Sequence, residues 1–298
     1  MVDFTSTIEY LNENGISFRE DTEGKYCTTF KTGGKIALFA EPKTESEAVG
    51  LIHFAQNKGV PYFLIGNGSN LLIGDEGLDM LVIKLCGELC SYKLCGNTLV
   101  CGGGASLAAA SKFSVACGFM GLEWAAGIPG TVGGAVAMNA GAYGGEIKQA
   151  LRRLTVIENG ELKTTDADIS LMGYRLSPYA YPECIVLSAV FELSPDDGGA
   201  KARMDDYSAR RREKQPVNYP SAGSTFKRPE GHFAGALIEN AGLKGMSVGG
   251  ARVSEKHAGF IINTGNATSG DVLELIRKVQ DIVFEKYGVR LEPEVKIL

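Results

Sequence analysis

The chain has 298 residues, which is enough for two or three domains with a sizeable core. Hydrophobic residues make up 44% of it, charged residues 22%, and the net charge is −5. These values are ordinary for a globular protein and argue against a chain built to coat nucleic acid. The polar, acidic beginning "MVDFTSTIEYLNENG" is unlike a secretory signal, so we expect a cytoplasmic protein.

The first elements in chain order are helices and buried strands. A short helix is expected over residues 7–14, ended by Gly15, and a longer one over residues 44–59, where Thr44 and Glu47 form a capping box. The apolar runs "YFLIG" and "MLVIKL" predict buried strands. A further helix is expected over residues 106–118.

Glycine-rich segments are the main anomaly of the composition. "LIGNGSNLLI" lacks the G-x-G-x-x-G spacing and the following helix of a Rossmann site. Its glycines could let backbone N–H groups cradle a diphosphate, although Gly-Asn-Gly also makes ordinary turns. "WAAGIPGTVGGAVAMNAGAYGG" is uncharged and long enough to span a bilayer, but its seven glycines and one proline favour tight turns over a membrane helix. Because two glycine-rich segments occur in one small domain, we favour loops that surround a large planar or phosphorylated ligand over plain turns between strands.

The seven cysteines give no metal-binding or disulfide pattern. Cys86, Cys90, Cys95 and Cys101 cluster, but there is no C-x-x-C pair and no histidine nearby. Reduced cysteines acting as small hydrophobic residues are favoured over a zinc site, and we predict no metal.

The second half changes character. Strands are expected over residues 151–158 and 184–193, and "GYRLSPY" holds Arg175 just before the second of them. We place the main domain boundary at the polar break "SPDDGG", residues 194–199. Helices are expected over residues 204–216, 232–242 and 268–288, and the last has a clear apolar stripe ended by Gly288. The chain is expected to end on the strand "VRLEPEVKIL".

Ser224, in "YPSAGSTFKRP", invites a catalytic interpretation. No histidine of the chain stands in a recognisable triad motif and there is no G-x-S-x-G elbow, which argues against Ser224 as an acyl nucleophile. Eight basic residues lie between Lys201 and Arg228, against three acidic ones. The run 210–212 is typical of a solvated helix face, whereas Lys214, Lys227 and Arg228 suit a phosphorylated substrate.

Taken in order, six motifs resemble the family of UDP-N-acetylenolpyruvoylglucosamine reductases, also called UDP-N-acetylmuramate dehydrogenases. They are "TTFKTGG", "LIGNGSNLLI", "GLEWAAGIPGTVGGAVAMNAGAYGGE", "GYRLSPY", "AGSTFKRP" and "LEPEV", and they cover nearly the whole chain. The resemblance implies FAD-dependent reduction of UDP-N-acetylglucosamine enolpyruvate to UDP-N-acetylmuramate with NADPH. This step belongs to peptidoglycan precursor synthesis in the cytoplasm, and so to cell-wall biogenesis, cell shape and cell division.

The resemblance also implies an α+β fold. Residues 1–195 would form an FAD-binding fold of the vanillyl-alcohol-oxidase class, in two α+β subdomains of about 1–60 and 61–195. Residues 196–298 would form an α+β substrate domain. The short stretch between Arg175 and Ser224 is similar to the second, shorter type of the family, which lacks a substrate-covering tyrosine loop. Lys31 stands where the family often has arginine, which leaves one flavin contact open.

The site residues carried over by motif fall into three groups. Arg175, Ser224 and Glu294 match the catalytic set, with Ser224 as proton donor and the other two stabilising an enolic intermediate. Lys214 and Arg228 match positions that contact the UDP part, and Lys227 stands beside them. The cofactor-binding residues would be Gly33, Gly34, Gly66, Asn67, Gly68, Ser69, Asn70, Leu71, Gly127, Ile128, Pro129, Gly130, Thr131, Gly133, Gly134, Ala137, Asn139, Gly141, Ala142 and Tyr143.

The expected partner is a small UDP-sugar enolpyruvyl ether, with no nucleic acid and no membrane insertion. Two other functions stay open from the residues alone. One is a flavin-dependent alcohol or sugar oxidase of the same fold class, although "LIGNGSN" lacks the histidine that often tethers FAD there. The other is a non-catalytic nucleotide-binding protein, which the basic strip alone would fit.

Overall fold

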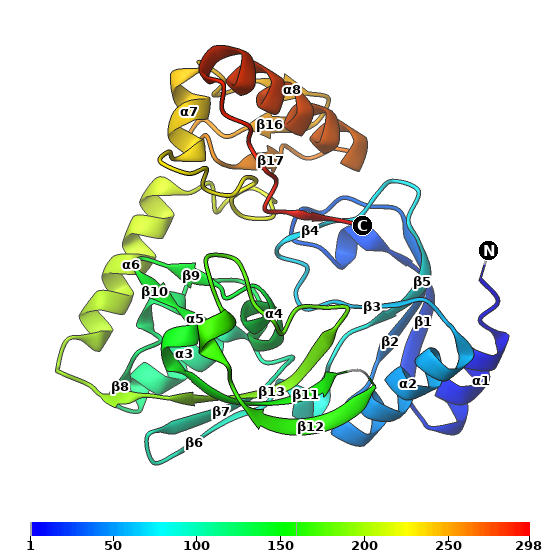
Figure 1. Cartoon of the computed structure of the whole chain (residues 1–298). Helices are drawn as coiled ribbons and strands as arrows, with labels where there is room; N and C mark the ends of the chain where they lie inside the picture. Colours follow the sequence, from blue (N-terminus) through cyan, green and yellow to red (C-terminus); the bar gives the residue numbers. More distant parts are fainter. Residues whose placement is uncertain (1, 159) are drawn as a thin grey trace. The chain divides into compact units, whose positions relative to one another are not determined.

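The computed structural model describes residues 2–158 and 160–298, coloured along the chain in Figure 1. The chain forms two compact units. The first unit comprises Met1–Glu20, Leu38–Gly66 and Asp79–Ala209, and the second unit comprises Asp21–Ala37, Asn67–Leu78 and Arg210–Leu298. Two segments from the N-terminal part of the chain, Asp21–Ala37 and Asn67–Leu78, thus belong to the second unit. The domain ranges expected from the sequence are contiguous and do not include this exchange. The expected domain ranges, with their boundary after residue 195, stay a prediction.

A sheet of four strands in the order β1-β2-β5-β3 carries two helices in the first unit. The elements are α1 (Thr5–Glu13), β1 (Ser17–Glu23), β2 (Lys35–Glu41), α2 (Glu45–Lys58), β3 (Tyr62–Leu64) and β5 (Leu78–Ile83). Leu11 of α1 and Leu51 of α2 are buried against Leu38 and Leu81 of the sheet. The two helices share one apolar core with the sheet. The expected helices and both expected strands are therefore present in this layer.

The start of α2 uses only half of the expected capping box. The Thr44 hydroxyl accepts from the N–H of Glu47 at 3.1 Å. The Glu47 carboxylate accepts from the N–H of Lys43 at 2.7 Å instead of reaching Thr44. Gly59 ends the helix at φ 66°, a left-handed conformation that glycine adopts without strain.

An antiparallel sheet in the order β12-β11-β13-β7-β6 forms the second layer of the first unit. Its strands are β6 (Tyr92–Cys95), β7 (Thr98–Gly102), β11 (Leu151–Glu158), β12 (Glu161–Asp166) and β13 (Cys184–Glu192). Helices α3 (Leu107–Ala116) and α4 (Val132–Ala137) lie over one face of this sheet (Figure 1). Their small apolar residues share one core with Phe191 of β13, so the glycine-rich segment around α4 is held on a rigid sheet.

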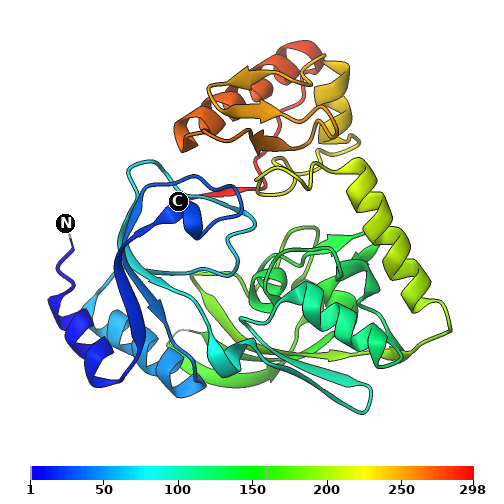
Figure 2. The same cartoon turned by 180° about the vertical axis from the view of Figure 1, so that it is seen from behind.

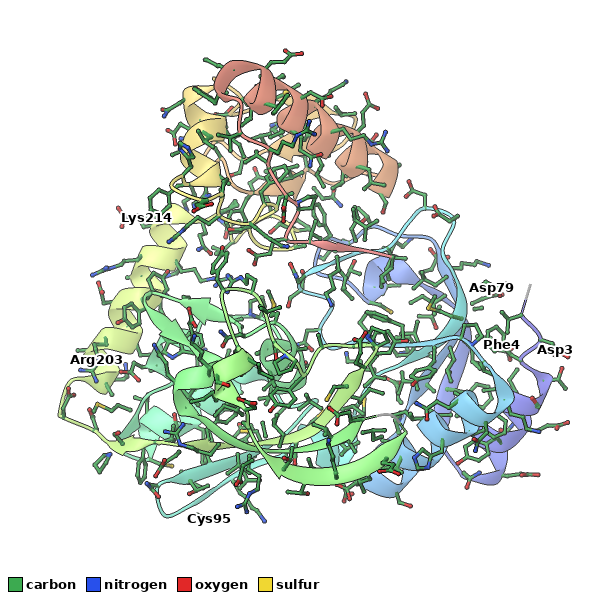
Figure 3. The ribbon with its side chains drawn as sticks, in the orientation of Figure 1. Asp3, Phe4, Asp79, Cys95, Arg203 and Lys214 are labelled. Carbon is green, nitrogen blue, oxygen red and sulfur yellow. The ribbon has the colours of Figure 1, made fainter. Side chains whose placement is uncertain are left out.

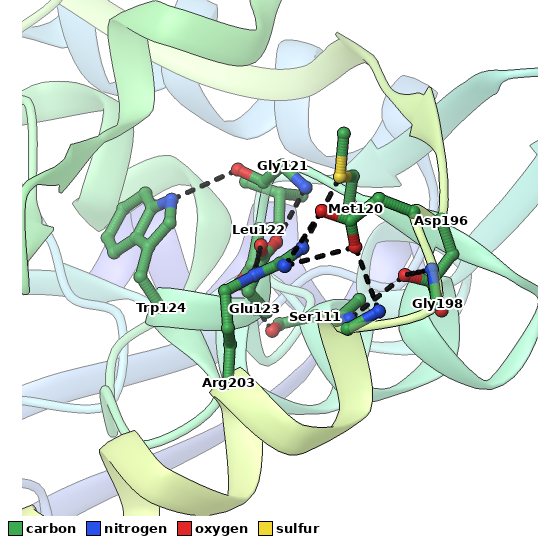
Figure 4. A network of polar contacts seen from close by, with 12 residues as sticks. Ser111, Met120, Gly121, Leu122, Glu123, Trp124, Asp196, Gly198 and Arg203 are labelled. Carbon is green, nitrogen blue, oxygen red and sulfur yellow. Dashed lines mark hydrogen bonds and ion pairs between the residues drawn. The ribbon is translucent and has the colours of Figure 1, made fainter.

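Helix α6 (Ala200–Lys214) is tied to the same layer by a polar network (Figure 4). The Arg203 guanidinium donates to Glu123 Oε1 at 2.9 Å and also pairs with Asp197 at 2.9 Å. Glu123 in turn accepts from the N–H of Gly121 at 2.6 Å. Figure 3 labels Arg203 and Lys214 toward opposite ends of this helix.

The predicted start of α6 at residue 204 is too late. The helix begins at Ala200, because the Asp196 carboxylate accepts from the N–H of Ala200 at 2.9 Å and so caps the first turn. The expected break is also shorter, since β14 (Ser194–Pro195) pairs with β8 (Phe119–Met120).

The core of the second unit is formed by helices packed on a three-stranded sheet. Its elements are α7 (Ala234–Asn240), β15 (Ser247–Val248), β16 (Ala251–Val253), β17 (Ile261–Asn263) and α8 (Ser269–Tyr287). Figures 1 and 2 both show α7 and α8 alongside β16 and β17. In α8, Thr268 and Asp271 form a complete capping box, and Gly288 ends the helix at φ 68°. The expected apolar stripe is buried here, apart from half-buried Ile282.

The strand expected over residues 289–298 is wrong except at its end. Only β18 (Lys296–Ile297) is a strand, and it pairs in parallel with β4 (Leu71–Leu72). Pro293 has no N–H to donate to a ladder and forms a single bridge with Phe226. The segment before β18 therefore lies as an irregular chain against the serine motif.

Short elements complete the chain. They are η1 (Gly24–Tyr26), η2 (Gly87–Cys90), η3 (Glu123–Ala125), β9 (Gly141–Ala142), β10 (Gly145–Glu146), α5 (Ile147–Ala150) and η4 (Ile169–Leu171). Among the described residues, no helix combines the length and the apolar character needed to cross a bilayer.

Candidate functional site

A pocket opens in the first unit, lined by Gly66, by residues of the second glycine-rich segment and by strand β13. Five of the expected cofactor residues line it: Gly66, Thr131, Gly133, Gly134 and Ala137. The wall also contains Lys84, Gly103, Gly104, Tyr179, Tyr181, Cys184 and Val186. The structure therefore brings part of the expected flavin set together around one cavity.

Glycines are required where the walls of this pocket meet. A Cβ on Gly66 would lie 2.4 Å from the Thr131 hydroxyl, and one on Gly103 would lie 2.2 Å from the carbonyl oxygen of Val186. Gly133 donates its N–H to the Gly103 carbonyl at 2.8 Å. A side chain would therefore meet the Thr131 side chain at Gly66 and the β13 backbone at Gly103, so glycine is needed at both positions of the cavity wall.

The sequence analysis did not identify the pocket residues that lie outside the two glycine-rich segments. The run "VCGGGAS" was itself a signal, because three glycines follow a strand and precede a helix. Tyr181 and Cys184 carried no signal, since they come from a distant segment. Burial raises the pKa of Cys184 to about 12, so its thiol stays neutral near pH 7 and adds an uncharged surface.

We predict that Gly103→Ala lowers stability by about 1–3 kcal/mol, the usual cost of forcing extra atoms into a packed site. The new methyl group would meet the backbone of β13, which cannot turn away as a flexible side chain could. Urea unfolding of the purified protein would measure the loss of stability. Gly134→Ala is the matched control, because its methyl group would meet only the Thr131 hydroxyl, at 3.3 Å. Equal stability of the two variants would contradict the prediction.

Arg175 occupies a tight turn in the first unit, not the approach to a strand that the sequence suggested. Gly173 and Leu176 exchange backbone hydrogen bonds of 3.0 and 3.2 Å, so Tyr174 and Arg175 form the two corners. The next strand, β13, begins only at Cys184. The Arg175 guanidinium donates to the Gly141 carbonyl at 3.3 Å, which links it to the second glycine-rich segment.

Tyr143, another expected cofactor residue, lies on the same glycine-rich segment. Its ring stacks on Tyr207 of α6 with a centroid distance of 4.7 Å and an interplanar angle of 9°. Its backbone has φ 54°, which is uncommon for a residue with a side chain. The stack on Tyr207 covers one face of this exposed ring.

Ser224 lies in the second unit, in a loop held by backbone hydrogen bonds on its C-terminal side. Gly223 before it has φ 78°, a conformation that favours glycine. Thr225 after it is 2% exposed, and it donates its N–H to the Gly259 carbonyl at 2.8 Å. The Thr225 hydroxyl accepts from the N–H of Ile261 at 3.0 Å. The half-buried Ser224 therefore projects from a fixed backbone.

Glu294 lies directly beside this loop in the second unit. Its N–H donates to the Thr225 carbonyl at 2.8 Å, and its carbonyl accepts from the Asn70 amide at 3.0 Å. Lys296 also donates its N–H to the Asn70 carbonyl at 2.9 Å. Three expected site residues from distant motifs, Asn70, Ser224 and Glu294, are thus brought together.

The basic residues of the second unit differ in their surroundings. The Lys227 ammonium lies 3.2 Å from the Glu292 carboxylate, and the backbone N–H of Lys227 donates to the backbone carbonyl of Glu292 at 2.9 Å. The Arg228 guanidinium lies 4.5 Å from the ring centre of Phe233. Lys214 is the exposed last residue of α6.

The first glycine motifs of the second unit are sites of close packing. A Cβ on Gly34 would lie 2.2 Å from the Asp75 carbonyl, and one on Gly68 would lie 2.1 Å from the Cys27 carbonyl. A Cβ on Gly33 would lie 2.8 Å from Ile73. Lys31 itself has φ 57°, and its carbonyl accepts from the Asn263 amide at 3.4 Å.

The cysteines are all free thiols. Burial raises the pKa of Cys86 and of Cys90, and the Cys90 thiol donates to the Leu85 carbonyl at 3.3 Å. Within residues 2–158 and 160–298, no group of three or more histidine, cysteine or acidic side chains is placed to hold a metal ion.

Comparison with known proteins assigns both parts of the chain. Residues 36–166 match the FAD binding domain family, and residues 215–298 match the C-terminal domain family of UDP-N-acetylenolpyruvoylglucosamine reductase. The reductase of Caldanaerobacter subterraneus is 44% identical over 97% of this chain and 96% of its own length. The chain belongs to the UDP-N-acetylenolpyruvoylglucosamine reductase family.

Two further relatives agree with this assignment. The reductase of Agathobacter rectalis is 47% identical over 98% of this chain and 97% of its own length. The crystal structure of the Thermus caldophilus reductase superposes with a TM-score of 0.81 at 35% identity, over 95% of this chain and 98% of that one. The expected family, flavin-binding fold, FAD cofactor and oxidoreductase activity are confirmed. The open alternatives of an oxidase and a non-catalytic protein lose their support.

Proposed function

We propose that this protein reduces the enolpyruvyl group of UDP-N-acetylglucosamine enolpyruvate to form UDP-N-acetylmuramate, with NADPH as hydride donor and FAD as cofactor. The observation that carries the proposal is the register of the second unit, where the Glu294 N–H bonds the Thr225 carbonyl at 2.8 Å. This contact holds the serine motif and the glutamate motif of the family side by side. We further propose that the enzyme acts in the cytoplasm and is of the shorter type.

The first unit fits the flavin. Its pocket is lined by glycines of both glycine-rich segments together with Tyr181 and Cys184. Gly66, Thr131, Gly133, Gly134 and Ala137 would hold the cofactor there. Bound FAD supplies the hydride chemistry between NADPH and the enolpyruvyl double bond.

The protein residues supply charge stabilisation and a proton. Addition of hydride to the terminal carbon leaves negative charge on the neighbouring carbon, which is shared with the carboxylate. The guanidinium of Arg175 stabilises this charge, and Glu294, in its protonated form, can donate a hydrogen bond to it. The Ser224 hydroxyl then gives its proton to the neighbouring carbon.

The basic residues serve the nucleotide part of the substrate. Lys214 and Arg228 have long basic side chains that suit a diphosphate. Lys227 can assist in the same way, although its ammonium is partly neutralised by Glu292.

Visible absorption spectroscopy tests this function. We expect flavin bands that bleach with anaerobic NADPH and return only when UDP-N-acetylglucosamine enolpyruvate is added. A colourless protein that cannot be reconstituted with FAD would contradict the cofactor. Rapid reoxidation by air without the enolpyruvyl substrate would instead indicate an oxidase.

A further inference from the structure

The turn that carries Arg175 is held in a conformation that arginine rarely adopts. Arg175 has φ 54° at the second corner of the turn closed by Gly173 and Leu176. Glycine and asparagine are the usual residues at such a corner, because a longer side chain is strained there. A strained backbone persists only where its surroundings determine it, so the neighbours of the turn must hold it in place.

The side chain of Asn139 is one of these neighbours. It is 1% exposed, and its amide donates to the Gly173 carbonyl at 2.8 Å and to Glu146 Oε2 at 3.0 Å. Its carbonyl oxygen accepts from the N–H of Lys148 at 3.0 Å. Both amide hydrogens and the oxygen thus have partners within the protein, which leaves this side chain little capacity for a ligand.

Lys148 forms a second tether to the same turn. Its ammonium donates to the Met172 carbonyl at 3.0 Å and lies 3.6 Å from Glu146 Oε2. Asn139 and Lys148 therefore hold two consecutive carbonyl groups that lead into the turn. Both come from the segment that also contains Gly141, whose carbonyl accepts from the Arg175 guanidinium at 3.3 Å.

We propose that Asn139 is a positioning residue for Arg175, with Lys148 as its auxiliary, rather than a direct flavin ligand. The inference rests on the proposed role of Arg175 in stabilising the enolic charge. Such stabilisation depends on donors fixed before the reaction, and a displacement of about 1 Å can cost 10²-fold in rate. Without the Asn139 amide, the Gly173 carbonyl loses its tether and the strained corner can relax away from its position.

The test is a double-mutant cycle on the FAD-loaded enzyme. Asn139→Ala should slow reoxidation of the reduced flavin by the enolpyruvyl substrate by roughly 10–100-fold, while flavin reduction by NADPH changes by less than about 2-fold. In an Arg175→Met background the same substitution should change reoxidation by less than about 2-fold, because the residue acts through the arginine. The dissociation constant of FAD, measured by titration of the apoprotein, should be unchanged.

Two further variants complete the design. Ser111→Ala is the matched control, because it removes another fully buried side-chain bond, from the Ser111 hydroxyl to the Leu122 carbonyl at 2.6 Å, in the same unit. It should leave both half-reactions unchanged. Lys148→Met keeps the buried amide and removes the half-exposed ammonium with its contacts to Met172 and Glu146. It also adds no left-handed strain, whereas Asn139 has φ 43°, so it covers the case in which Asn139→Ala does not fold. It should slow reoxidation by about 3–10-fold, again only when Arg175 is present.

The outcomes separate the two proposals. Additive losses in the cycle, or equal slowing of both half-reactions, would overturn the positioning role while leaving Arg175 in the mechanism. A weakened FAD affinity in Asn139→Ala would instead make Asn139 a cofactor residue. Normal reoxidation in Arg175→Met alone would refute the role of the arginine, and the positioning role with it.

Discussion

Replacing Ser224 by alanine is expected to slow reoxidation of reduced flavin by the enolpyruvyl substrate by about 10²–10⁴-fold, the usual contribution of a positioned general acid. The hydroxyl is the proposed proton source, and no carboxylate or histidine of the chain is proposed to replace it. Flavin reduction by NADPH should continue at its normal rate, because that step needs no proton from Ser224. Anaerobic stopped-flow absorbance separates the two half-reactions.

The structure makes this substitution a mild one for the fold. The loop around Ser224 is held through the backbone and hydroxyl of Thr225 and through the left-handed Gly223, none of which alanine at position 224 disturbs. A loss of activity can therefore be assigned to the missing hydroxyl. A solvent isotope effect on reoxidation would show whether the proton transfer itself has become slower.

Ser221→Ala is the matched control for this prediction. Ser221 lies three residues earlier in the same loop, and its backbone carbonyl accepts from the Thr29 hydroxyl at 2.7 Å, a bond that the substitution keeps. We expect normal rates in both half-reactions for this variant. Reoxidation of Ser224→Ala at the rate of the Ser221→Ala control would remove Ser224 from the mechanism.

Signals within a short stretch of sequence predicted those helices whose ends are set by residues nearby in the chain. Gly59 and Gly288 adopt the left-handed conformation that ends α2 and α8, as their positions in the sequence indicated. The apolar stripe of α8 also identified its buried face, because a period of 3.6 residues describes a helix whatever it packs against. Each of these signals depends on residues that are no more than about four positions apart in the chain.

Features that depend on distant partners could not be predicted in this way. Nothing local to Glu294 indicates that its N–H meets the Thr225 carbonyl, and nothing local to Tyr181 places it in the pocket wall. The terminal strand failed partly for the same reason, because the chain there follows the serine loop through the bridge between Pro293 and Phe226. Pro293 itself was a local signal against a strand, since it has no N–H for a ladder. These contacts result from tertiary packing that overrides local strand propensity.

The site lies between these two cases. Motif resemblance predicts Asn139 as a cofactor residue and Arg175 as a catalytic residue, but it could not say that the Asn139 amide bonds the Gly173 carbonyl of the turn that carries Arg175. The turn around Arg175 carries no glycine or asparagine at its left-handed corner, so the sequence shows no sign of the turn. Strain of this kind is expected at functional sites, where local preference and the required geometry disagree.

Removing the charge of Arg175 is expected to slow the same half-reaction by about 10²–10³-fold, which is the usual effect of losing one preorganised donor to a developing anion. Arg175→Met keeps most of the side-chain length. Arg153→Met is its control, because the exposed Arg153 of β11 only pairs with the exposed Asp166 of β12, at 3.1 Å. Methionine shares the strain of arginine at φ 54°, so Arg175→Asn is needed as well. Asparagine tolerates the left-handed conformation, and it removes the charge while keeping the turn.

If the arginine acts by its charge, both variants should be slow in reoxidation and normal in reduction by NADPH. A slow methionine variant beside a normal asparagine variant would show that the turn, and not the guanidinium, is what the reaction requires.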